Sequence, residues 1–100
     1  MARSLSRLPA VERDLAVVVN EEIEAGSVAA VARGAAGGLL HGLRLFDVYR
    51  GAPLAPDEKS LAIRLVLQSP DRTLTDTEVD TVMAGVAGAL AAELGARLRA

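Results

Sequence analysis

The chain has 100 residues, a length typical of one domain and too short for two. Apolar residues make up 51% of it, chiefly Ala, Val and Leu, and the formal net charge is −2. A negative net charge disfavours a general nucleic-acid binder, which is usually clearly basic. The absence of cysteine excludes disulfides, a thiol nucleophile and a zinc–thiolate site.

No segment of the sequence is suited to a membrane. The longest uninterrupted apolar stretch, residues 82–92, has 11 residues, whereas a membrane-spanning helix needs about 20. The residues after Met1 show no basic start followed by an apolar stretch and a cleavage site. We therefore expect a cytoplasmic protein without membrane contact.

The first part of the chain predicts a lead-in, a strand and a helix. We expect residues 1–10 to be extended. Residues 13–20 carry β-branched and apolar side chains at both odd and even positions, so both faces of the strand are apolar, which is typical of a central strand. After a loop over residues 21–26, Ser27 can cap a helix that runs to about Ala36, where a glycine pair ends it. The apolar face of this helix is expected to hold Val28, Val31, Ala32 and Ala35.

Two strands joined by a turn come next. Residues 39–50 predict the second strand, and residues 51–57, with two prolines, predict the turn. Residues 59–68 give the clearest strand pattern, because large aliphatic side chains alternate with smaller or polar ones. A shift of one residue would expose the aliphatic side chains, so the pattern sets the register firmly. The buried face is expected to hold Leu61, Ile63, Leu65 and Leu67.

A long helix follows. Thr75 and Glu78 fit a capping box, in which each side chain accepts a hydrogen bond from the backbone of the other residue. Gly85 and Gly88 weaken this helix by roughly 1 kcal/mol each relative to Ala, and we expect close approach to the sheet to compensate. The apolar stripe that faces the core is expected to hold Val79, Val82, Met83, Val86, Leu90 and Leu94.

Gly95 ends this helix, and residues 96–99 predict a last strand with Leu98 facing inward. The order strand, helix, strand, strand, helix, strand is that of the ferredoxin-like βαββαβ sandwich, an α+β fold. Right-handed crossovers place both helices on one face of a four-stranded antiparallel sheet. The expected strand order is fourth, first, third, second. We expect one domain over residues 1–100, with an open face opposite the helices.

The open face is expected to carry the most distinctive residues of the chain. Within Phe46-Asp47-Val48-Tyr49, alternation turns Phe46 and Val48 inward and Asp47 and Tyr49 outward. The outward ring of Tyr49 and the outward carboxylate of Asp47 are suited to binding single-stranded RNA. Its bases stack on aromatic side chains and form hydrogen bonds through their edges. A carboxylate suits guanine, because it can accept from the exocyclic amine and the ring N–H. The same face is expected to hold Ala16, Val18, Ser60, Arg64, Arg97 and Arg99.

Five short motifs occur in order at domain-like spacing. They are Pro9 with Arg13-Asp14-Leu15-Ala16, Leu45-Phe46-Asp47-Val48-Tyr49-Arg50-Gly51, Lys59-Ser60-Leu61-Ala62, Gln68-Ser69 with Asp71-Arg72-Thr73-Leu74-Thr75-Asp76, and Leu98-Arg99. Together they resemble the C-terminal ferredoxin-fold anticodon-binding domain of the bacterial phenylalanyl-tRNA synthetase beta subunit. The resemblance covers nearly the whole chain.

This resemblance implies a domain that reads the anticodon loop of phenylalanine tRNA. The positions that match the family's RNA contacts are Asp47, Tyr49, Ser60 and an arginine of the last strand. We place that arginine at Arg99, with Arg97 as the alternative. A base is implied to stack on Tyr49, while Asp47 and Ser60 hydrogen-bond base edges. Arg99 is implied to meet a base or a phosphate.

The resemblance also implies partners and a context. The partners are phenylalanine tRNA, the remainder of the beta subunit and the alpha subunit. Because the family's domain normally ends a much longer chain, we expect this one to be an excised C-terminal piece. No cofactor and no catalysis are implied for the domain itself, since ATP and magnesium belong to the parent enzyme.

The alternative function is a small-ligand-binding or oligomerisation module of ferredoxin-like fold. Its support is that Leu43 and Leu45 share the parity of Tyr49, so they would add apolar surface to the open face.

Simpler structural roles are open for several polar residues. Asp47 can be a solvated strand residue or an ion-pair partner of Arg64. Arg13 and Asp14 are expected to form an ion pair at the end of the first strand. The single histidine, His41, has no second His or Cys with which to bind a metal.

Overall fold

The computed structural model describes residues 9–99, which contain one antiparallel sheet of four strands. The order across the sheet is β2-β3-β1-β4, as predicted. Most of the expected lead-in, residues 1–8, lies outside the described residues. The strands are β1 (Val11–Asn20), β2 (Leu40–Tyr49), β3 (Glu58–Leu67) and β4 (Arg97–Leu98).

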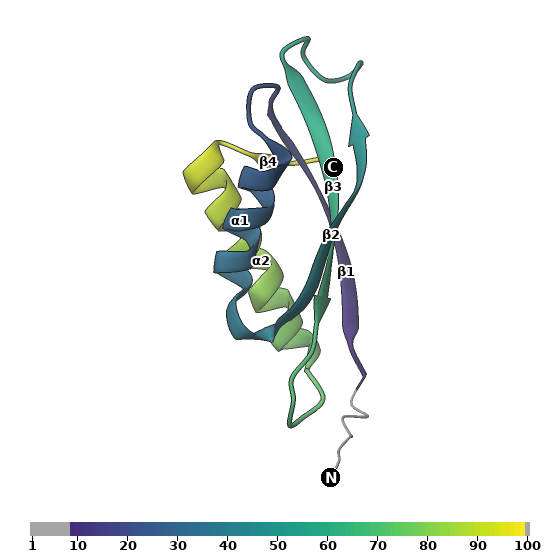
Figure 1. The fold of residues 1–100 in the computed structure, drawn as a ribbon, viewed down its shortest axis with the longest axis vertical. Coiled ribbons are helices and arrows are strands. Elements are labelled where there is room, and N and C mark those ends of the chain that lie inside the picture. Colours follow the sequence, from purple (N-terminus) through teal and green to yellow (C-terminus); the bar gives the residue numbers. More distant parts are fainter. Residues whose placement is uncertain (1–8, 100) are drawn as a thin grey trace.

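Two helices, α1 (Ala25–Ala36) and α2 (Asp76–Leu94), cover one face of the sheet (Figure 1). Within the described part of the chain, no helix covers the other face. A short 3₁₀ turn, Gly37–Leu39, connects α1 to β2. These features confirm the ferredoxin-like βαββαβ fold. The β2–β3 hairpin projects beyond the helix layer, so its end has little covering on either side (Figure 1).

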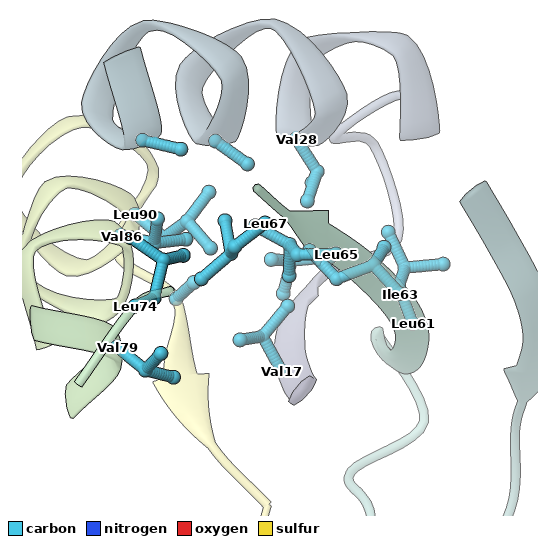
Figure 2. Close-up of a cluster of buried hydrophobic side chains, with 14 residues drawn as sticks. Val17, Val28, Leu61, Ile63, Leu65, Leu67, Leu74, Val79, Val86 and Leu90 are labelled. Atoms are coloured by element: carbon cyan, nitrogen blue, oxygen red, sulfur yellow. The ribbon is translucent and has the colours of Figure 1, made fainter. Parts of the chain in front are cut away.

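The hydrophobic core lies between the sheet and the helices, and β3 supplies its largest side chains. Four aliphatic residues of β3 alternate along the strand and are each no more than 1% exposed. They pack against Val28 of α1 and against Val86 and Leu90 of α2 (Figure 2). Full burial of such a side chain contributes about 1.5–3 kcal/mol. The four residues are Leu61, Ile63, Leu65 and Leu67, as predicted.

The N-terminus of α2 has the predicted capping box. The Thr75 hydroxyl accepts from the Glu78 amide at 3.1 Å, and the Glu78 carboxylate accepts from the Thr75 amide at 3.0 Å. Arg72 forms an ion pair with the same carboxylate. Leu74 and Val79, on either side of the cap, are both buried. The helix therefore begins with its first amides satisfied and its entry packed on the core.

The N-terminus of α1 differs from the prediction. The helix begins at Ala25 with Glu24 as N-cap, and no side chain caps it. The Ser27 amide donates to the Glu24 carbonyl at 3.0 Å, so Ser27 already belongs to the first helical turn. The prediction of Ser27 as the cap was wrong, because backbone turns after β1 bring the chain into helical geometry three residues earlier. Ala36, rather than Ala35, is the last buried residue of this helix.

The two glycines within α2 also differ from the prediction. Gly85 and Gly88 are exposed, and a Cβ atom at either position would meet no heavy atom within 4 Å. They lie off the stripe of Val79, Val86 and Leu90 that faces the sheet. Close approach to the sheet is therefore not the reason for these glycines, and nothing in the structure explains them.

The short strand β4 is fastened to the edge of the sheet by a charged contact. It pairs with β1 over only two residues. The Arg97 guanidinium donates to both carboxylate oxygens of Glu58 on β3, at 2.6 and 3.0 Å. Leu98 was expected inward but is 56% exposed, because an edge strand of this length has neighbours on one side only.

We expect Gly85→Ala to raise the free energy of unfolding by up to about 1 kcal/mol, since Ala favours a helix more than Gly does. The added methyl group enters open space. Urea denaturation followed by circular dichroism measures the change. Gly95→Ala is the matched control and should lower stability, because Gly95 has a φ of 67°. A loss of stability in Gly85→Ala would contradict the placement of this residue.

Acid should release β4 before the rest of the sheet. Hydrogen bonds from Arg97, and then from the Ala55 amide, lower the pKa of Glu58 from 4.5 to about 2. The ion pair therefore stabilises β4 fully above about pH 4.5 and is lost as the pH falls toward 2. The readout is the hydrogen-exchange protection of the Arg99 amide, which donates to the Ala16 carbonyl at 2.9 Å.

The controls for the acid experiment are an amide of the central strand and a variant. Protection within β3 should persist over the same pH range. Glu58→Gln should lower protection of Arg99 at neutral pH and remove its pH dependence. Equal protection of Arg99 at pH 6 and pH 2 in the unmodified chain would show that the ion pair does not hold β4.

Candidate nucleic-acid interface

The sheet register places the four predicted contact residues on the helix-free face. Tyr49 pairs with Ser60, and Asp47 pairs with Ala62. Because the intervening Leu61 faces the helices, Ser60 and Ala62 face away from them, and so do their partners on β2. The backbone of Arg99 bonds to Ala16, which pairs with Ala62, and this register puts Arg99 on the same face.

A β-bulge changes the orientation of Phe46. Leu45 pairs with Ile63 and Asp47 pairs with Ala62, which leaves Phe46 as an extra residue between them. At such a bulge two consecutive side chains project to the same side of the sheet. Phe46 is 45% exposed, and its ring centroid lies 5.0 Å from the guanidinium carbon of Arg64, an open-face residue. The prediction that Phe46 is buried was therefore wrong.

Val48 faces the helices as predicted but is not buried. It pairs with Leu61 on the core side of the sheet. It nevertheless remains exposed, because this part of β2 lies at the sheet edge in the projecting hairpin (Figure 1). Phe46 and Val48, which were expected to be buried together, are therefore both exposed.

The same bulge reverses the expected orientation of two leucines. Leu43 pairs with Leu65, and Leu45 pairs with Ile63, so both face the helix side. Leu43 packs against the core. Simple alternation counted back from Tyr49 had put these leucines on the open face, but the extra residue at Phe46 inverts the parity. The observation that supported a ligand-binding or oligomerisation module is therefore removed.

An arginine and a tyrosine from opposite edges of the sheet meet over the open face. The guanidinium carbon of Arg99, just after β4, lies 4.5 Å from the ring centroid of Tyr49 on β2. Because β1 and β3 lie between those edges, the two side chains together cross the middle of the sheet. Val18 and Ser60, which pair with each other on this face, are both buried.

The geometry of Tyr49 leaves its ring as the group available for contact. The hydroxyl donates to the Ala52 carbonyl in the hairpin turn at 2.6 Å. This bond fixes the direction of the side chain and uses its one donor. Tyr49 is 37% exposed, and the Arg99 guanidinium stacks on it. A hollow of about 410 Å³ opens beside this contact; it is lined by Val18, Pro53, Leu54, Arg97, Leu98 and Arg99.

Ser60 differs from the other three residues, because its side chain is only 3% exposed. It lies in the row between Tyr49 and Val18, where the Arg99–Tyr49 contact crosses the sheet. In this conformation the Asp47 side chain is exposed, whereas Arg99 covers one face of the Tyr49 ring and Ser60 is buried.

The predicted ion pair of Arg13 with Asp14 is absent, and Asp14 pairs with Arg64 instead. Arg64 on β3 donates to both carboxylate oxygens of Asp14 on β1, at 2.8 and 3.0 Å. Consecutive strand residues face opposite sides, so Arg13 cannot share the face of Asp14; it donates instead to the Glu12 carbonyl. Asp47 is likewise not the partner of Arg64. The hydrogen bonds from Arg64 lower the pKa of Asp14.

The ion pairs separate the charges of the open face into engaged and free groups. Arg97 is engaged by Glu58, whereas Arg99 has no ion pair within the described residues. This difference favours Arg99 over Arg97 as the mobile cation. Among residues 9–99, neither Arg44 nor Asp47 makes an ion pair or a side-chain hydrogen bond, and both are exposed.

Sequence reasoning placed Arg64 on the open face as observed but missed Phe46 and Arg44, which lie beside it on that face. One signal for their placement was present. Apolar residues occupy odd positions at Leu43 and Leu45 and then even positions at Phe46 and Val48. Such a change of parity within one strand is what a bulge produces.

Other kinds of site find no support within residues 9–99. No three His, Cys, Asp or Glu side chains gather there as a metal site would require, and His41 lies exposed on β2. None of the helices described has the length and apolar character needed to cross a membrane.

Comparison with known proteins identifies the family. Residues 6–99 match the ferredoxin-fold anticodon binding domain. The chain is 56% identical over 95 residues to the phenylalanine–tRNA ligase beta subunit of Moorella thermoacetica, covering 95% of this chain. It is 44% and 43% identical over 97 residues, 97% of the chain, to the beta subunits of Anaeromyxobacter dehalogenans and Aromatoleum aromaticum. The chain spans 12% of the length of each of these relatives. The family match and the ferredoxin-like fold show that this chain belongs to the ferredoxin-fold anticodon binding domain family.

Proposed function

We propose that this chain is the anticodon-binding domain of a phenylalanine–tRNA ligase beta subunit and reads the anticodon loop of phenylalanine tRNA on its open face. The observation that carries the proposal is the convergence of a ring, a free carboxylate and a free guanidinium on one helix-free surface. These groups belong to Tyr49, Asp47 and Arg99. The family match and the names of the relatives support the same role.

Tyr49 supplies the stacking surface. Its hydroxyl is already bonded to the hairpin turn, so the ring is held in one orientation before RNA arrives. Arg99 occupies the ring face where a base would stack, and no ion pair within residues 9–99 holds it there. A base takes the place of the guanidinium, which then turns to a phosphate or a base edge. Stacking of one base contributes about 1–3 kcal/mol.

Asp47 supplies base recognition. Its carboxylate lies two residues from Tyr49 on the same face and has no partner among residues 9–99. A carboxylate accepts two hydrogen bonds from the ring N–H and the exocyclic amine of guanine, and it repels bases that present acceptors there. Ser60 is 3% exposed, so its hydroxyl joins this recognition only after the side chains around it move.

The wider context follows from the same proposal. The partners are phenylalanine tRNA, the remainder of the beta subunit and the alpha subunit, in the cytoplasm. Stacking and hydrogen bonding need no cofactor, so the domain uses none, and ATP and magnesium act elsewhere in the parent enzyme. The domain contributes binding and no catalytic step.

Replacing the ring should separate stacking from every other contribution. Tyr49→Ala is expected to weaken binding of a phenylalanine-tRNA anticodon stem-loop by about 1–3 kcal/mol, whereas Tyr49→Phe keeps the ring and should stay close to the unmodified chain. Fluorescence anisotropy of the labelled stem-loop measures both. An unrelated stem-loop is the control RNA. Equal affinity of the Ala variant and the unmodified chain, or equal affinity for both RNAs, would count against the site.

The carboxylate can be tested by removing the donor it recognises. Replacing a loop guanine by inosine deletes the exocyclic amine, and we expect the unmodified chain to bind the inosine RNA more weakly. Asp47→Asn should bind both RNAs with similar affinity, because the charged acceptor is gone. Asp80→Asn, an exposed change on α2, is the matched control and should keep the preference. A preference that survives in Asp47→Asn would remove Asp47 from base recognition.

A further inference from the structure

We propose that the stacked pair of Phe46 and Arg64 is a second base-binding platform, which receives another unpaired base of the same RNA loop. This inference rests on the proposed function and extends the contact surface along β2. A strict alternation would turn Phe46 toward the helices; the bulge turns it to the open face.

The two aromatic residues of the chain have equivalent surroundings. Tyr49 and Phe46 both lie on β2, both are more than one third exposed, and each carries an arginine stacked on its ring. Bases stack on aromatic rings and on guanidinium planes alike. The structure therefore presents the same chemical surface twice on one strand.

The Phe46–Arg64 platform is held in place by hydrogen bonds to Arg64. Asp14 holds the guanidinium of Arg64 through two hydrogen bonds, at 2.8 and 3.0 Å, while its carbon stays 5.0 Å from the ring centroid. Arg99 has no such anchor among residues 9–99. A base therefore displaces Arg99 at Tyr49, whereas at Phe46 it stacks on the ring face that Arg64 does not cover and leaves the guanidinium in place.

The charges around Arg44 leave a place for a phosphate. Arg44 is directly opposite Arg64 in the β2–β3 register, and like charges in such a pair repel. Arg64 pairs with Asp14 at 2.8 Å and with Glu12 at 3.9 Å, but Arg44 has no ion pair within the described part of the chain. A phosphate beside Arg44 would relieve this repulsion. A hollow of about 270 Å³ opens at this place, lined by Glu12, Gly42, Leu43, Arg44, Arg64 and Val66.

The spacing suits an open loop. Three residues of a strand span about 10 Å, and the bulge shortens this somewhat. The distance between Phe46 and Tyr49 therefore exceeds the repeat of about 3.4 Å between stacked nucleotides in a helix. Two bases can occupy the platforms only if the backbone between them is extended, as it is in a splayed single strand. Asp47 then lies between the two bases.

The test uses the 100-residue chain and the anticodon stem-loop of phenylalanine tRNA, with 2-aminopurine placed at one unpaired loop position at a time. The fluorescence of this base changes when it stacks. We expect Phe46→Ala to weaken binding about 5- to 100-fold and to abolish the fluorescence change at one loop position. Tyr49→Ala should abolish it at a different position.

Two further variants separate stacking from folding. Phe46→Leu keeps an apolar side chain, and we expect it to lose the same fluorescence change while the circular dichroism spectrum stays unaltered. Leu45→Ala truncates a neighbour of similar exposure, 38%, that faces the helices, and it should retain both positional signals.

The phosphate contact has its own readout. Arg44→Gln should reduce the slope of log affinity against log salt by about 0.7, the value for one phosphate on a single strand. Arg33→Gln removes an exposed arginine of α1 and should leave the slope unchanged.

The outcomes distinguish this inference from the proposed function. If Phe46→Leu keeps the affinity and every positional signal while Tyr49→Ala loses them, the second platform is overturned and the proposed function stands. If the same loop position responds to both aromatic variants, there is one platform and not two. If the unmodified chain fails to bind the stem-loop, the proposed function fails first.

Discussion

The pairing of β2 with β3 is the constraint on which the open face depends. β3 is fixed by burial, because its alternate leucines and isoleucine fill the core and a shift by one residue would expose all of them. β2 has no comparable anchor of its own and takes its orientation from β3. Its bulge at Phe46 then decides which side chains accompany Tyr49. One extra residue thus removes two leucines from the open face and adds an aromatic ring to it.

The charge arrangement explains how a chain with net charge −2 can present the proposed RNA-binding surface. Two carboxylates of the open face, those of Asp14 and Glu58, are bonded to Arg64 and Arg97, so their charges are neutralised and repel RNA less. What remains free is local: two arginines near the edges and one carboxylate between the aromatic rings. Binding of this kind relies on stacking and base edges more than on phosphate neutralisation, which suits recognition of a short loop.

Most of the fold was predictable from local signals, and the reasons are physical. Alternation in β3 and the Thr75 capping box are each encoded within a few residues, and the topology rules then leave one arrangement of the elements. The start of α1 was missed because backbone bonds, rather than a side chain, begin that helix. The glycines of α2 were misjudged because helix propensity does not say which way a residue faces.

The site was only partly predictable, because its residues depend on a bulge and on long-range contacts. A strict period of two placed Asp47 and Tyr49 correctly, since both follow the bulge. It misplaced Leu43, Leu45 and Phe46, which precede it or form it. The contact of Arg99 with Tyr49 joins residues 50 positions apart across the full width of the sheet. No local pattern specifies such a contact, although the sheet order makes it geometrically accessible.

The weakest element of the fold therefore carries one side of the proposed site. β4 pairs over two residues, and Arg99 extends from its end to the far edge of the sheet. Glu58 and Arg97 hold β4 in place without using Arg99. One arginine therefore anchors the strand, and the other remains available to contact RNA. This division lets the Arg99 side chain leave Tyr49 while the backbone stays paired to β1. Arg99 covers the Tyr49 ring in the free protein. When a base displaces it, its guanidinium still lies at the border of the surface, where the RNA backbone would pass.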